Sequence, residues 1–82
     1  MQTMEIEQKF RSAVKMVECL GFDFDKLDVS TRFEEDMGFD SLDNIELIMA
    51  TEEMFDVDIS EEDACKIETY GDALNYLKRA TT

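Results

Sequence analysis

The sequence predicts an all-α fold: a small four-helix bundle of three main helices and one short helix, with a long loop between helices one and two. Three observations support this prediction. Hydrophobic residues make up 44% of the 82 residues, which suits the modest core of a single domain over residues 1–82. Three glycines and no proline leave few tight turns. Helical spacing or a helix-start signal recurs in four segments.

The first helix is expected from about Met4 to Leu20, followed by Gly21 as a left-handed cap. One apolar stripe follows helical spacing along it: Ile6, Phe10, Ala13, Val14, Val17 and Leu20. No helical period persists from Gly21 to Asp40, so we expect a loop there, held by buried apolar side chains. These anchors are Phe22, Phe24, Leu27, Val29, Phe33, Met37 and Phe39.

Three further helices are expected in the second half of the chain. The second spans Ser41 to about Asp56. A short third helix follows Ser60, because residues 60–63 (SEED) resemble a capping box with acids in the first turn. The last helix starts near Thr69, buries three apolar residues and ends in two cations that suit a helix C-terminus. The apolar residues are Ala73, Leu74 and Leu77, and the cations are Lys78 and Arg79.

The formal net charge of −13 argues against nucleic acid as a partner, because phosphates would meet like charge. It favours partner proteins with basic patches, whose encounter a long-range field would accelerate. No apolar run reaches membrane-spanning length and no signal-peptide-like segment opens the chain, so neither a membrane nor export is expected. Cys19 and Cys65 lack a Cys-x-x-Cys spacing, so we expect small core residues in a reducing, cytoplasmic monomer.

The second helix divides into two faces at about 100° per residue. The core face is expected to hold Asn44, Leu47, Ile48, Thr51, Met54 and Phe55. The opposite face interleaves acids with the apolar residues Leu42, Ile45 and Met49. This pattern predicts a surface that other proteins recognise, although a solvated face with a few stray apolar residues would also give it. The candidate docking residues are Asp43, Glu46, Met49, Glu52, Glu53 and Asp56.

Ser41 stands at the start of this helix, where a serine is ordinarily an N-cap. A nucleophilic serine would need a base, and the chain has neither a histidine nor a Gly-x-Ser-x-Gly turn. Asp40 and Asp43 are nearby, but ordinary carboxylates are poor bases for a hydroxyl. We therefore expect no catalytic residue, and we interpret Ser41 as a substrate that another enzyme modifies.

The segment around Ser41 also carries a family resemblance. Residues 33–38 (FEEDMG) lead into residues 40–43 (DSLD), and the likeness continues at matching spacings to Leu77. Over this region the chain resembles the acyl carrier protein family, which folds as a four-helix bundle. The resemblance implies that a phosphopantetheinyl transferase moves 4′-phosphopantetheine from coenzyme A onto Ser41, with Asp40 and Leu42 beside it. The arm's thiol then holds acyl groups as thioesters and presents them to fatty-acid or related enzymes of polyketide or specialised lipid synthesis.

In the acyl carrier protein family, the inner face of the second helix and the third helix together line a cavity for the acyl chain. The corresponding residues here are Leu47, Ile48, Thr51, Ile59, Ala64 and Ile67. Ordinary core packing is the alternative role for all of them. Phe39 and Thr51 depart from the family pattern, which suggests a differently shaped access to the arm and a cavity for shorter or more polar acyl groups.

The acid-rich composition and the helical pattern leave three alternatives to compare. A calcium-binding loop starting at Asp23 or Asp56 lacks the glycine at its sixth position, so no metal site is expected. An acidic helical interaction or regulatory domain without a prosthetic group would use the same second-helix surface. A carrier of amino acids on the same fold also stays possible, although DSLD favours the fatty-acid or polyketide type. Modification of Ser41 separates the carriers from the regulatory domain.

Overall fold

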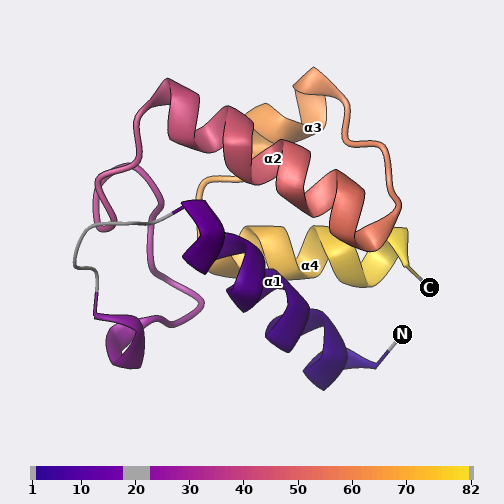
Figure 1. The fold of residues 1–82 in the computed structure, drawn as a ribbon, viewed down its shortest axis with the longest axis horizontal. Coiled ribbons are helices and arrows are strands. Elements are labelled where there is room, and N and C mark those ends of the chain that lie inside the picture. Colours follow the sequence, from indigo (N-terminus) through magenta and orange to yellow (C-terminus); the bar gives the residue numbers. More distant parts are fainter. Residues whose placement is uncertain (1, 18–22, 82) are drawn as a thin grey trace.

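The computed structural model describes residues 2–17 and 23–81, which form a bundle of four α-helices (Figure 1). The helices are α1 (Thr3–Val17), α2 (Ser41–Phe55), α3 (Glu61–Lys66) and α4 (Tyr70–Ala80), with a short 3₁₀ turn, η1 (Phe24–Lys26). These residues contain no β-strand, so the all-α prediction is confirmed. The expected end of the first helix at Leu20, the Gly21 cap, Phe22 and Cys19 lie outside the described residues.

α1 supplies the centre of the core, and its predicted apolar stripe is buried as far as Val17. Phe10 and Val14 are among the largest fully buried side chains of the described residues. α1 packs against both α2 and α4, and Figure 1 shows α2 above α1 and α4, with the short α3 next to α2. The core therefore lies beneath α2, and the opposite face of α2 is free to meet solvent.

The loop from residue 23 to residue 40 is held by apolar anchors, as predicted. Phe33, Met37 and Phe39 are buried, and Phe24 and Leu27 pack partly against the core. Val29 is an exception, because 63% of its surface is exposed. Its backbone holds the loop instead: the Val29 carbonyl accepts the N–H of Gly71 at 3.0 Å. A Cβ at Gly71 would lie 2.7 Å from that oxygen, so a side chain there would push the loop away.

Side-chain caps define the starts of α3 and α4. The Ser60 hydroxyl accepts the N–H of Asp63 at the start of α3, and Thr69 and Asp72 form a full capping box for α4. Cys65, which was expected in the core, is exposed. The physical reason is that α3 has only six residues and buries none of them, so it offers no interior site for a small side chain.

Candidate functional site

Ser41 is the first residue of α2, but it does not cap that helix. Asp40 is the N-cap: its Oδ1 accepts the N–H of Asp43 at 2.9 Å, and Asp43 Oδ2 accepts the N–H of Asp40 at 3.2 Å. The ordinary role of a serine at a helix start is therefore filled by the neighbouring carboxylate, and not by Ser41. The Ser41 side chain is exposed and forms no hydrogen bond within the described part of the chain.

The turn before Ser41 is fixed by an aromatic anchor. Phe39 is 5% exposed, and its ring stacks on Phe33 at a centroid distance of 5.7 Å. The N–H of Phe39 also donates to the carbonyl of Phe33 at 2.9 Å, and Gly38 has a φ of 77°, which glycine adopts without strain. Phe39 therefore anchors the turn that leads into Ser41 from within the core.

A polar contact holds the same turn against the first turns of α2. Asn44 Nδ2 donates to Glu34 Oε1 at 3.1 Å, and the backbone carbonyl of Glu34 accepts the N–H of Gly38 at 3.1 Å. An amide on the face expected to be buried needs a hydrogen-bond partner. Asn44 finds that partner in the loop, at the edge of the helix nearest Ser41.

The start of α2 fits a phosphodiester. The backbone N–H groups of Ser41 and Leu42 find no acceptor among the described residues, because Asp40 satisfies only the next two donors. A helix N-terminus with free N–H groups and a positive dipole end favours a phosphate ester. The exposed hydroxyl of Ser41 lies beside these groups and can accept the covalent bond without loss of any internal contact.

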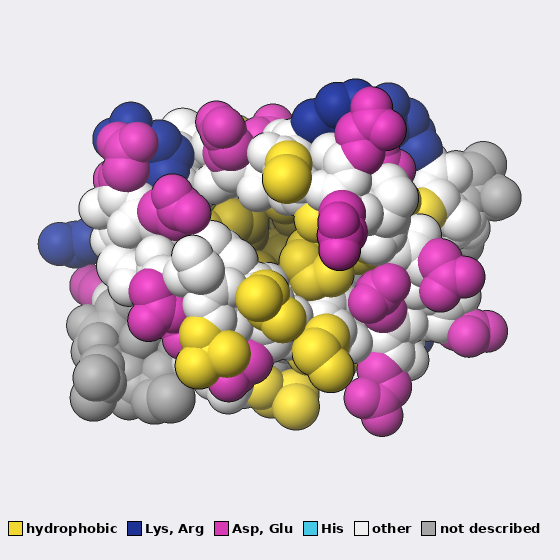
Figure 2. Space-filling view, turned by 90° about the horizontal axis from the view of Figure 1, so that it is seen from above, with side chains coloured by type: hydrophobic (Ala, Val, Ile, Leu, Met, Phe, Trp, Pro, Cys, Tyr) yellow, Lys and Arg dark blue, Asp and Glu magenta, His cyan; other side chains and the backbone are white. Residues whose placement is uncertain are grey.

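The outer face of α2 combines acids with exposed apolar side chains, as its sequence pattern predicted. Leu42, Ile45 and Met49 are 61%, 56% and 62% exposed, and Glu46 and Glu53 are exposed among them. Figure 2, which views the molecule from the α2 and α3 side, shows apolar side chains around a central hollow with Asp and Glu side chains spread about them. Side chains of this size stay in water only at a cost, so the face is suited to a partner.

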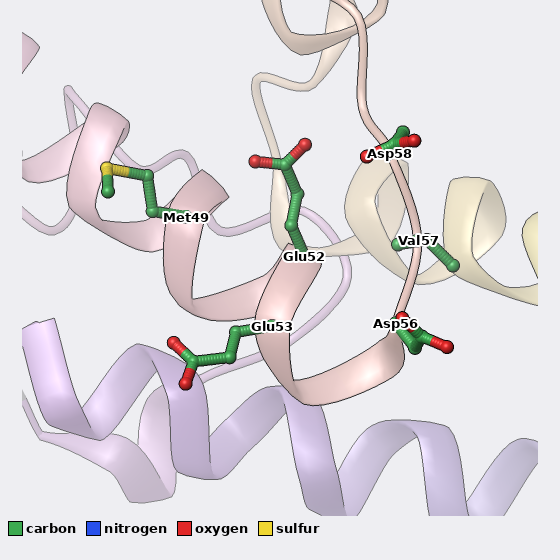
Figure 3. A pocket seen from close by; sticks show the side chains of 6 residues that line it. All are labelled: Met49, Glu52, Glu53, Asp56, Val57 and Asp58. Atoms are coloured by element: carbon green, nitrogen blue, oxygen red, sulfur yellow. The ribbon is translucent and has the colours of Figure 1, made fainter.

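An open groove of about 360 Å³ lies at the C-terminal end of this face (Figure 3). It is lined by Met49, Glu52, Glu53, Asp56, Val57 and Asp58. Glu52 points toward the segment that holds Asp58, and its carboxylate accepts the N–H of Ile59 at 2.9 Å, so it also fastens that segment. The sequence reasoning missed Val57 and Asp58, because they follow the helix and a helical wheel does not place them.

A second, narrower cavity lies beneath α2. Of the six predicted pocket residues it brings together Leu47, Ile48, Thr51, Ile59 and Ile67. Ala64, the sixth, is not part of this lining; it lies on α3, whose residues are not buried. The other lining residues are Phe10, Ala73, Tyr76 and Leu77. These come from α1 and α4, so the pattern of the second helix could not indicate them.

The described residues hold no group of His, Cys, Asp or Glu side chains that could bind a metal ion. Among the same residues, no helix has the length and apolar character needed to span a bilayer. The candidate site in the described residues consists of an exposed hydroxyl, an acidic and apolar helix face, and an apolar cavity beneath that face.

Comparison with known proteins agrees with this arrangement. A family described as "Phosphopantetheine attachment site" matches residues 15–77, which include α2, α3 and most of α4. The chain is also 40% identical to the acyl carrier protein of Akkermansia muciniphila over 79 residues, or 96% of each chain. Both matches extend far beyond the segment around Ser41. The chain therefore belongs to the family of acyl carrier proteins with a phosphopantetheine attachment site.

Proposed function

We propose that Ser41 carries the prosthetic arm of this carrier and that the outer face of α2 presents it to enzymes of fatty-acid or related polyketide or specialised lipid synthesis. As a member of its family, the chain carries covalent 4′-phosphopantetheine, is a substrate of a phosphopantetheinyl transferase and catalyses no reaction itself. The attachment residue, the pathway and the docking residues form the proposal.

One observation carries the proposal for Ser41: its hydroxyl is exposed at a helix start while Asp40 provides the cap. In the transfer, Ser41 Oγ forms a bond to the phosphorus that bears pantetheine, and the bond from that phosphorus to the adenosine bisphosphate part of coenzyme A breaks. The hydroxyl proton needs a base, which we assign to the transferase, since the chain has no histidine. The free N–H groups of Ser41 and Leu42 would then face the ester oxygens.

The arm's terminal thiol holds the acyl group as a thioester when the arm is bound. We assign the docking of acyl-processing enzymes to Asp43, Glu46, Met49, Glu52, Glu53 and Asp56. Carboxylates on this face would attract basic patches, and Leu42 and Met49 would add a small apolar contact. An interface of this kind forms quickly, dissociates quickly and weakens in salt, which suits a monomeric cytoplasmic carrier that visits several enzymes.

The cavity beneath α2 supports a second part of the proposal, namely that the carrier shelters its acyl group. Leu47, Ile48, Thr51, Ile59 and Ile67 line one narrow apolar space beneath α2, and this shared lining supports the proposal. An acyl chain placed there would leave water, with a gain of about 0.8 kcal/mol for each buried methylene group.

The experiment for Ser41 is an intact mass after incubation with coenzyme A and a broad-range transferase. The wild-type chain is expected to gain the mass of one phosphopantetheine, and Ser41→Ala is expected to gain none. Ser12→Ala is the matched control, because Ser12 is also an exposed helical serine and should leave the gain unchanged. A gain that persists in Ser41→Ala would contradict the proposal.

A further inference from the structure

The cavity beneath α2 contains one polar side chain in its interior. Thr51 is only 2% exposed, whereas the hydroxyl of Tyr76 lies at the surface and contacts the carbonyl of Asp58 at 3.5 Å. The remaining lining side chains are apolar. Thr51 Oγ1 donates its proton to the carbonyl of Leu47 at 2.7 Å. Since a hydroxyl has one proton and two lone pairs, Oγ1 can only accept a hydrogen bond from any further group.

The free space in the cavity is small, about 10 Å³, which is close to the room that one water molecule needs. Any cargo must therefore displace part of the lining. Phe10 and Leu77 are fully buried, so enlarging the cavity toward α1 and α4 would disrupt the tightest part of the core. On the other side Ile67 is only partly buried, and it follows α3, which buries no residue. Space can therefore open near α3, but depth is limited by the core.

We propose that Thr51 makes this cavity selective for a short acyl group that bears a hydroxyl, in preference to longer saturated chains. This inference rests on the proposed function, since it needs a cargo attached beside the cavity. A hydroxyl that enters an apolar cavity loses its hydrogen bonds to water, at a cost that a partner must offset. The Oγ1 lone pairs of Thr51 supply that partner. A long saturated chain forms no hydrogen bond with Thr51, and the buried side chains of Phe10 and Leu77 limit how deeply it can enter.

The test loads the chain with butyryl, 3-hydroxybutyryl or octanoyl groups from the corresponding coenzyme A esters, with isotope-labelled terminal methyl groups. NMR then measures two properties of that methyl group: its ring-current shift from Phe10 and Tyr76, and its relaxation by a paramagnetic agent in the solvent. Together they give the ratio of sheltered to exposed cargo. Thr51→Val has nearly the same shape but no acceptor, and Thr51→Ser keeps the acceptor.

For the wild-type chain we expect the sheltered-to-exposed ratio to be about fivefold higher for 3-hydroxybutyryl than for butyryl, as one net hydrogen bond allows. Octanoyl is expected to stay mostly exposed. Thr51→Val should remove the preference and Thr51→Ser should retain it. Equal sheltering of octanoyl, or a preference that survives in Thr51→Val, overturns the inference alone. Failure of the chain to take up any of the acylated arms overturns the proposed function as well.

Discussion

At the scale of single residues, Asp40 caps α2 and Ser41 presents a free hydroxyl, two roles that a single serine could have filled. Asp40 takes the capping hydrogen bond from Asp43, so the hydroxyl of Ser41 has no part in holding the helix. A modified N-cap serine would have to give up its cap whenever it received a phosphate ester. The division allows the start of α2 to keep the same structure with and without an attached group.

The first prediction concerns this cap. Asp40→Ala should lower the free energy of unfolding by about 1 kcal/mol, because the N–H of Asp43 loses its acceptor. Asp40→Asn retains a side-chain oxygen and should stay within a few tenths of a kcal/mol of the wild-type value. Urea denaturation followed by circular dichroism measures both. Equal stability of the alanine and asparagine variants would contradict the capping role.

The second prediction concerns Tyr70 and alkaline pH. Burial raises the pKa of Tyr70 above its ordinary value of 10.0, and the negative charge of Glu7 raises it further. The unfolded chain therefore loses this proton more readily than the folded chain does. The stability that follows from the raised pKa is complete below about pH 10 and falls as the pH rises above it.

Tyr70→Phe provides the matched variant, because it keeps the ring that packs 5.6 Å from Phe10 and removes the ionising group. The free energy of unfolding of this variant should fall less between about pH 9 and about pH 11 than that of the wild type. Lysine and the other tyrosine titrate in both proteins, so the difference between the two curves isolates Tyr70. Parallel curves would show that Tyr70 ionises equally in both states.

At the scale of elements, α2 shows which residues of the site could be predicted from the sequence and which could not. Helical spacing separated its buried face, with Leu47, Thr51 and Phe55, from its acidic outer face, because one period governs both. The residues that it could not indicate lie on other elements. Phe10 of α1 joins the cavity, and Asp58 joins the groove, only through tertiary packing. Ala64 was placed in the cavity by resemblance, and the short α3 leaves it outside.

The third prediction tests the outer face of α2. Glu46→Lys combined with Glu53→Lys should lower kcat/KM of a partner enzyme for the loaded carrier by about tenfold, through loss of electrostatic attraction. Both side chains are exposed, so the thermal unfolding midpoint should change little. Glu5→Lys combined with Glu68→Lys makes the same change in net charge away from α2 and is the control. Equal losses in both double variants would show that net charge alone matters.

At the scale of the whole molecule, the charge of −13 is carried by a chain of 82 residues with little internal compensation. The ion pairs found among the described residues both involve Arg32, with Glu35 and Asp36, and all three side chains are largely exposed. Exposed pairs of this kind contribute little to stability. The apolar core beneath α2 therefore holds the fold together against a general repulsion between carboxylates.

The fourth prediction follows from this repulsion. The midpoint of thermal unfolding should rise when the ionic strength increases from about 0.01 M to about 0.15 M, because the screening length falls from about 30 Å to about 8 Å. Differential scanning calorimetry with sodium chloride and then with potassium chloride measures the change and controls for binding of a particular cation. A midpoint that does not change would mean that repulsion has no measurable effect on the fold.

The position of the arm is the claim on which docking, sheltering and selectivity all depend. Fragmentation mass spectrometry of the modified wild-type chain tests it without any substitution. We expect every fragment that contains Ser41 to carry the phosphopantetheine mass, and fragments that contain Ser12, Ser30 or Ser60 instead to lack it. A modified chain whose added mass maps to any other residue, or a chain that takes up no added mass, would contradict the account.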